Sequence, residues 1–137
     1  MKIILDTNIW ISFLLGKRLS ILREIVDMEE VDIYVSDELL AGLRSVAFRP
    51  KFQGKIDFQS VLNLFELINA KCKIIEGYKD AESAIRDIKD LYLLSMAESI
   101  PADYLVTGDD DLLVLRNHLG TKIITFAEFV SIVRQES

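Results

Sequence analysis

Several residue types that build common active sites and linkers are scarce in this chain of 137 residues. It contains one cysteine, one histidine and two prolines, and no stretch rich in glycine, serine or proline. Because Cys72 is alone, no internal disulfide can form, which predicts a reducing, cytoplasmic setting. The flanking Lys71 and Lys73 could lower the pKa of the thiol, but a half-buried cysteine in a strand is the preferred interpretation. His118 lies in a predicted surface turn, which argues against a nucleophile activated by histidine.

Long apolar runs are also missing. No segment approaches the roughly 18 to 20 apolar residues of a membrane span. The first residues form a strand pattern without the architecture of a signal peptide. Half of the residues are nevertheless apolar. The chain is therefore expected to fold as a single domain, residues 1–137, with a substantial core and no membrane association.

Positive charge is in the minority. The chain has 16 basic and 22 acidic residues, a net charge of −6. Such a protein is a poor general binder of nucleic acid, because affinity for the phosphate backbone comes largely from Lys and Arg. The objection weakens if the acids gather in a site that metal ions neutralise. The acidic balance also favours a basic protein partner.

Short apolar runs alternate with amphipathic segments along the whole chain. Ser36 is a natural N-cap for one predicted helix, and Thr7 or Asn8 for another. Strands are predicted over 2–5, 31–35, 72–75, 104–107 and 122–124, and helices over 9–15, 19–28, 37–49, 58–68, 91–100, 110–115 and 126–133. This alternation predicts an α/β fold, a three-layer α/β/α sandwich with a mainly parallel central sheet.

Three acidic segments lie beside the predicted ends of strands or the starts of helices. Asp6 follows the first strand, Asp109 to Asp111 follow the strand over 104–107, and Asp87 and Asp90 precede an apolar helix. Taken singly, each has a structural explanation, as a helix cap, a turn or an acid favoured by the helix dipole. Taken together, they place carboxylates at one edge of one sheet, where ligands bind in open parallel folds. Carboxylates suit Mg²⁺ or Mn²⁺, and two such ions can support phosphodiester hydrolysis.

The motifs and their order resemble those of PIN domains, the fold of many bacterial toxin ribonucleases. The opening motif is Leu-Asp-Thr-Asn at 5–8, and Tyr-Leu-Val-Thr-Gly-Asp follows about a hundred residues later, at 104–109. The segments 36–40, 49–52 and 86–90 fit the family between these two motifs. More closely, the chain resembles the toxin components of toxin–antitoxin pairs. The resemblance covers nearly the whole chain and implies an α/β/α fold.

The resemblance also implies a site and an activity. It assigns catalysis and metal binding to Asp6, Asp90 and Asp109, and secondary metal binding to Asp111. Supporting roles fall to Asn8, Thr107 and Asp87. The implied activity is that of an endoribonuclease dependent on Mg²⁺ or Mn²⁺, in which a metal-activated water cleaves single-stranded RNA. The implied partners are RNA and a cognate antitoxin protein, and a homodimer is left open.

One departure from the family pattern concerns the predicted third helix. Relatives usually carry a glutamate where this chain has Gly42. Glu38 lies one helical turn earlier on the same face, about 5 to 6 Å away. It either replaces the missing ligand or is a first-turn acid favoured by the helix dipole. Smaller departures are Ile88 and Leu91. A module that binds RNA or a protein partner with weakened catalysis is therefore the alternative function.

Basic residues near the acidic segments are candidates for binding RNA phosphates. The stretch 44–55 contains four basic residues and no acid, and two more flank Asp87. These six candidates are Arg44, Arg49, Lys51, Lys55, Arg86 and Lys89. A solvated loop explains them equally well. The aromatic residues, including Trp10 and Phe13, are expected at core positions of helices, so stacking on nucleic-acid bases is not indicated.

Overall fold

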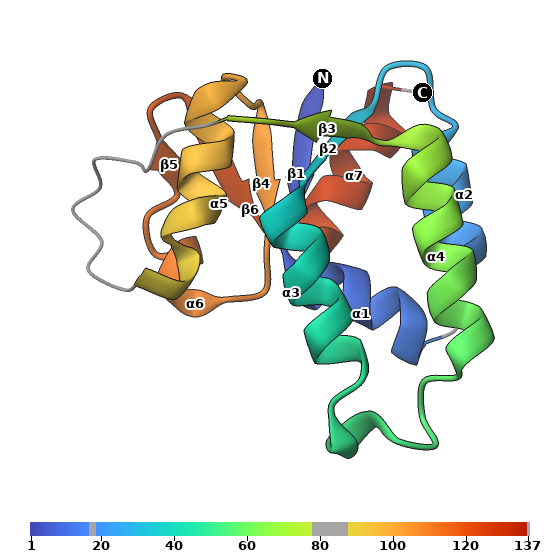
Figure 1. Cartoon of the computed structure of the whole chain (residues 1–137). Helices are drawn as coiled ribbons and strands as arrows, with labels where there is room; N and C mark the ends of the chain where they lie inside the picture. Colours follow the sequence, from blue (N-terminus) through green and yellow to red (C-terminus); the bar gives the residue numbers. More distant parts are fainter. Residues whose placement is uncertain (17–18, 78–87, 137) are drawn as a thin grey trace.

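The computed structural model describes residues 1–16, 19–77 and 88–136, with the backbone alone for 88–90 and 136. Within these residues one sheet has the strand order β3-β2-β1-β4-β6-β5 (Figure 1). Its strands are β1 Lys2–Leu5, β2 Asp32–Ser36, β3 Lys73–Ile75, β4 Tyr104–Val106, β5 Asn117–His118 and β6 Thr121–Ile124. All neighbouring strands pair in parallel except β5, which runs antiparallel to β6.

Helices cover both sides of this sheet. α5 packs against β1 and β4, and α7 lies on the other side of these central strands (Figure 1). The helices are α1 Thr7–Leu15, α2 Leu19–Val26, α3 Asp37–Ala47, α4 Phe58–Lys71, α5 Ile88–Ser99, α6 Asp110–Leu113 and α7 Phe126–Glu136, with a 3₁₀ turn η1 Pro50–Phe52. The predicted α/β/α sandwich with a mainly parallel sheet is confirmed.

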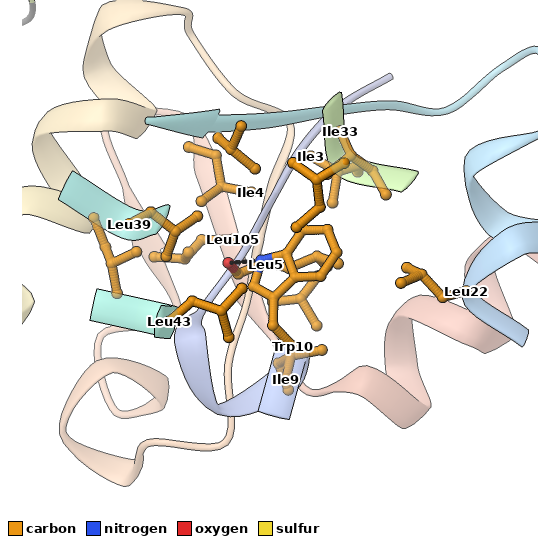
Figure 2. Packing of buried hydrophobic residues seen from close by; sticks show 14 of the residues in the cluster. Ile3, Ile4, Leu5, Ile9, Trp10, Leu22, Ile33, Leu39, Leu43 and Leu105 are labelled. Atoms are coloured by element: carbon orange, nitrogen blue, oxygen red, sulfur yellow. Dashed lines mark hydrogen bonds between the residues drawn. The ribbon is translucent and has the colours of Figure 1, made fainter. Parts of the chain in front are cut away.

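The first strand and helix form the centre of the core. Ile3, Ile4 and Leu5 are completely buried, as expected for a central strand covered on both faces. The indole of Trp10 donates a hydrogen bond to the carbonyl of Leu5 at 3.0 Å, and apolar side chains surround it (Figure 2). Burial of each such large side chain stabilises the fold by about 1.5 to 3 kcal/mol. This packing holds the junction of β1 and α1 in one conformation.

Two local predictions about polar residues in this framework were wrong. The N-cap of α1 is Asp6 rather than Thr7 or Asn8, because β1 runs into the helix without a loop. The predicted surface turn is present at Leu119 and Gly120, but His118 itself belongs to β5, where it is half-buried and its Nε2 lies 2.7 Å from Oε1 of Glu98. The prediction of Ser36 as the N-cap of α3 is confirmed, since its hydroxyl accepts a hydrogen bond from the amide of Leu39.

The prediction of a half-buried Cys72 is confirmed and the disfavoured alternative, a thiol activated by its flanking lysines, is excluded, but the predicted position in a strand was wrong. The residue caps the end of α4 instead of lying in a strand. Burial raises the pKa of its thiol to about 12, so the flanking lysines do not activate it. Lys71 and Lys73 instead form ion pairs with Asp27 and Asp32, at 3.0 Å and 3.3 Å.

The expectation that the aromatic residues lie in the core holds for some of them only. Trp10 and Phe13 are buried, and the Phe13 ring packs edge-on against Phe126 at 5.4 Å between centroids. Phe48 and Phe58 are 53% and 62% exposed. They lie where α3 ends and α4 begins, in the segment that extends beyond the sheet (Figure 1). No helix in the described part of the chain meets the length and apolarity needed to span a membrane.

Candidate active site

Asp6 and Thr107 continue two neighbouring parallel strands past their ends. The amide of Asp6 donates to the carbonyl of Val106 at 2.9 Å, and the amide of Thr107 donates to Ile124 at 2.9 Å. This register brings the two side chains to one edge of the sheet. The hydroxyl of Thr107 donates to Oδ2 of Asp6 at 2.7 Å, within a buried environment. The predicted supporting role of Thr107 therefore has a direct geometric basis.

The carboxylate of Asp6 is held in an unfavourable electrostatic environment. Its residue is 5% exposed, and burial is the largest cause that raises the pKa of this carboxyl above its ordinary value. The negative charge of Asp109 raises the pKa further, whereas the Thr107 hydroxyl and the nearby amides of Thr7 and Asn8 lower it. A buried carboxylate with an acidic neighbour is stabilised by a cation.

Asp109 is joined to the same network from the next segment of chain. Its amide donates to the hydroxyl of Thr107 at 3.0 Å, so one threonine connects both acids. Oδ1 of Asp109 accepts from the amide of Asp111 at 2.9 Å and caps α6. The side chain of Asp111 is exposed on that helix. The structure thus brings Asp6, Thr107 and Asp109 together and leaves Asp111 at their border.

A groove of about 490 Å³ opens beside Asp6. Its lining consists of Asp6, Thr7, Asn8, Gly42, Val46, Arg49 and Tyr92. A side chain at Gly42 would point at Thr7, because a Cβ built there lies 4.0 Å from the threonine hydroxyl. Glu38 is exposed in the first turn of α3 and does not line the groove. The position of the missing family glutamate therefore faces the site.

α5 begins at the same edge of the sheet. The short connection from α5 to β4 makes the helix run antiparallel to the strand, so its first turn lies near the end of β1. Tyr92, two residues after Asp90, confirms this placement, since its hydroxyl lies 3.3 Å from Oγ1 of Thr7. Asp90 is part of that first turn, but its side chain lies outside the described residues, as does all of Asp87.

Thr7 and Tyr92 were not predicted as part of the site. Thr7 directly follows Asp6, and Tyr92 comes two residues after Asp90. This closeness in sequence to a predicted acid was the signal that could have identified them. Among the side chains that the structure describes, no group of three His, Cys, Asp or Glu residues is close enough to hold a metal ion. The donors that are described, Asp6 and Asp109, are hard oxygens that suit Mg²⁺ or Mn²⁺. Their mutual repulsion fits a site that binds a divalent cation.

The predicted basic residues are distributed unevenly. Arg49 lines the groove beside Asp6. The guanidinium of Arg44 lies 5.2 Å from the ring centroid of Phe65, and Lys51 lies over Phe52 at 4.9 Å. Lys55 is exposed in the segment between η1 and α4, whereas Arg86 and the side chain of Lys89 lie outside the described residues. Among the basic candidates that the structure describes, Arg49 is thus the one that lines the same groove as Asp6.

Comparisons with known proteins agree with this architecture. A family model described as PIN domain matches residues 2–111. Among solved structures, the chain is similar to VapBC2 from Rickettsia felis bound to a DNA fragment from its promoter, with 18% identity and a TM-score of 0.57. That match covers 92% of this chain and 99% of the other, and it shows a shared fold. No curated protein matches the chain. The family match spans well over half of the sequence, so the chain belongs to the PIN domain family, whose members are generally nucleases.

Proposed function

We propose that the protein is a metal-dependent endoribonuclease that cleaves single-stranded RNA, with Asp6, Asp90 and Asp109 as its essential acids. The observation that carries this proposal is the buried carboxylate of Asp6, which shares Thr107 with Asp109. A protein gains no stability from two acids placed in this way without a cation. Their placement at the carboxyl edge of the sheet supports a catalytic use.

Each residue of the site has a distinct task in this proposal. Thr107 fixes the orientation of Asp6 and, through the amide of Asp109, the spacing of the two acids. Asp6 and Asp109, with Asp90 and Asp111, would hold Mg²⁺ or Mn²⁺. When bound, such an ion supplies positive charge to the scissile phosphate and lowers the pKa of the attacking water. Arg49 in the groove would bind a neighbouring phosphate of the RNA.

A protein partner is also part of the proposal. The similar structure is a VapBC2 complex from Rickettsia felis bound to promoter DNA. By that likeness, the chain would be the toxin of a toxin–antitoxin pair and would bind a cognate antitoxin. A net charge of −6 favours a partner with a basic binding segment. The homodimer and the cytoplasmic location stay predictions from the sequence.

A weakened enzyme is the second candidate function. Gly42 faces the groove but provides no ligand, and Glu38 does not line that groove. A site with one carboxylate fewer binds its cation less tightly. The protein would then act by binding RNA or its antitoxin. Mn²⁺-dependent cleavage distinguishes the two functions directly.

The test is cleavage of labelled single-stranded RNA by purified protein with Mn²⁺, with Mg²⁺ and with EDTA. We expect cleavage in both metals, and loss of cleavage in Asp6→Asn, Asp90→Asn and Asp109→Asn. Asp103→Asn is the matched control, because this exposed acid accepts from the amide of Lys2 at the opposite edge of the sheet. Cleavage that persists in the three site variants would show that the activity comes from elsewhere. No cleavage by the wild type would favour the binding module.

A further inference from the structure

Two large aromatic rings lie on the surface near the groove that contains Asp6. Phe48 ends α3 and Phe58 begins α4, and their ring centroids are 6.0 Å apart with a tilt of 39°. Both rings are more than half exposed. They border a hollow of about 380 Å³ that Pro50, Phe52 and Ile56 also line. Contact with water does not stabilise exposed phenyl rings, so this pair is suited to a ligand with flat apolar faces that would cover them.

The surroundings of this aromatic pair are basic. Between Glu38 and Asp57 the chain has four basic residues and no acid, a local charge of +4 in a protein of −6. The nearest following acid, Asp57, is engaged as the N-cap of α4, with Oδ1 2.8 Å from the amide of Ser60. Rings flanked by Arg and Lys are typical of proteins that bind single-stranded nucleic acid. An acidic or purely apolar partner segment would not need both features.

Arg49 connects the aromatic hollow to the acidic groove. It lines the hollow together with Phe48 and Phe58, and it also lines the groove together with Asp6. The two depressions are therefore adjacent, with Arg49 at their boundary. One strand of nucleic acid could place a phosphate at Arg49, a base on the rings and the next phosphate toward Asp6.

We propose that Phe48 and Phe58 form a base-stacking subsite for single-stranded RNA that continues the acidic groove. The rings hold unpaired bases by stacking, and Arg49, which lines both depressions, holds a phosphate of the same strand. The subsite rests on the proposed function for its substrate class. It explains how an acidic protein binds RNA, because the phosphate contacts are gathered in one basic segment. Duplex RNA is excluded, since its bases are already stacked on one another.

The test is RNA binding in EDTA, where cleavage cannot occur, measured by fluorescence anisotropy with a short labelled single-stranded RNA. Phe48→Ala and Phe58→Ala should each raise the Kd roughly 5- to 150-fold, the range expected for one stacked base. Phe58→Trp should retain tight binding, whereas Phe58→Leu should bind as weakly as Phe58→Ala. Leu119→Ala is the matched control, because this apolar side chain is 78% exposed at a distant turn.

Two further measurements identify the ligand and its contacts. An RNA of the same length with abasic positions should bind equally to wild type and Phe58→Ala, since no base remains to stack. Arg49→Gln should reduce the slope of log Kd against log salt by roughly 0.7, the value for one phosphate contact on a single strand. Thermal melts of each variant confirm that the fold is retained.

The proposal is overturned if both alanine variants bind the RNA as tightly as the wild type, or if Phe58→Leu does. A change in self-association on sedimentation, with unchanged RNA affinity, would instead make the rings a protein interface. Failure of the proposed nuclease function is a separate result. That failure would be seen as cleavage that does not depend on Asp6, while RNA binding would still depend on Phe48 and Phe58.

Discussion

Replacing Thr107 with valine removes one hydroxyl and retains the shape of a completely buried side chain. The hydroxyl donates to the carboxylate of Asp6 at 2.7 Å and accepts from the amide of Asp109 at 3.0 Å. Hydrogen bonds to charged groups contribute about 1.5 to 3 kcal/mol. We therefore expect Thr107→Val to lower the free energy of unfolding by about 2 kcal/mol at neutral pH. For a domain of this length, that corresponds to about 7 °C in the melting midpoint.

The loss should depend on pH in a defined direction. Burial raises the pKa of folded Asp6 above its ordinary value of 3.8, so the folded state binds this proton more tightly than the unfolded state. The stability contributed by Asp6 therefore increases as the pH falls through its folded pKa. The Thr107 hydroxyl lowers that pKa by stabilising the ionised form. The difference between wild type and Thr107→Val should be largest at neutral pH and should shrink as Asp6 becomes protonated.

Urea unfolding of the metal-free protein at neutral and at acidic pH measures this difference. Thr107→Ser keeps the hydroxyl and should retain most of the stability. Thr121→Val is the matched control, because the buried hydroxyl of Thr121 donates to the neutral carbonyl of Ala102 at 2.7 Å. The decrease in the free energy of unfolding caused by Thr121→Val should be the same at both pH values. An equally pH-independent loss in Thr107→Val would refute the argument that this hydroxyl stabilises an ionised Asp6.

The remaining predictions concern the third helix and the cysteine. Gly42→Glu should tighten Mn²⁺ binding and increase RNA cleavage, because the new side chain points at Thr7 beside the acids. It should also destabilise the metal-free protein. Titration calorimetry measures the binding, the cleavage assay the activity, and thermal melts in EDTA the stability. If Glu38 already supplies the missing ligand, Glu38→Gln will abolish cleavage and Gly42→Glu will add little. No effect from either variant would mean that this helix does not contribute to the metal site. Cys72 should resist iodoacetamide at pH 8 in the folded protein, because burial raises its thiol pKa to about 12; rapid alkylation, followed by mass spectrometry, would contradict this.

The parts of the fold that could be predicted from the sequence are those with one dominant cause. A short apolar run followed by a helical pattern leaves few alternatives to a parallel sheet, and parallel strands end at a common edge. The proximity of Asp6 and Thr107 follows from this rule and from the pairing of β1 with β4. The orientation of position 42 toward the site could be predicted from the resemblance, which places a metal-binding glutamate there.

The features that were not predicted depend on contacts that a local pattern does not contain. The turn at Leu119 and Gly120, both with positive φ, was predicted, but the antiparallel strand β5 before it was not, because its two residues carry no apolar alternation. Phe48 and Phe58 have the spacing of core residues, but their segment extends beyond the sheet, and the part of the chain that the structure describes leaves both rings more than half exposed. Tyr92 joins the site through a contact with Thr7 across 85 residues of sequence. Such contacts are set by tertiary packing.

The most direct test of the central claim compares the melting midpoints of wild type and Asp6→Asn in EDTA and in excess Mn²⁺. In EDTA the variant should melt higher than the wild type, because it loses a buried charge and can still accept from Thr107. Mn²⁺ at about 100 times its dissociation constant should stabilise the wild type by roughly 2.7 kcal/mol, or about 9 °C, and leave the variant unchanged. A wild type with the same midpoint in EDTA and Mn²⁺, together with a variant that melts lower in EDTA, would contradict the account.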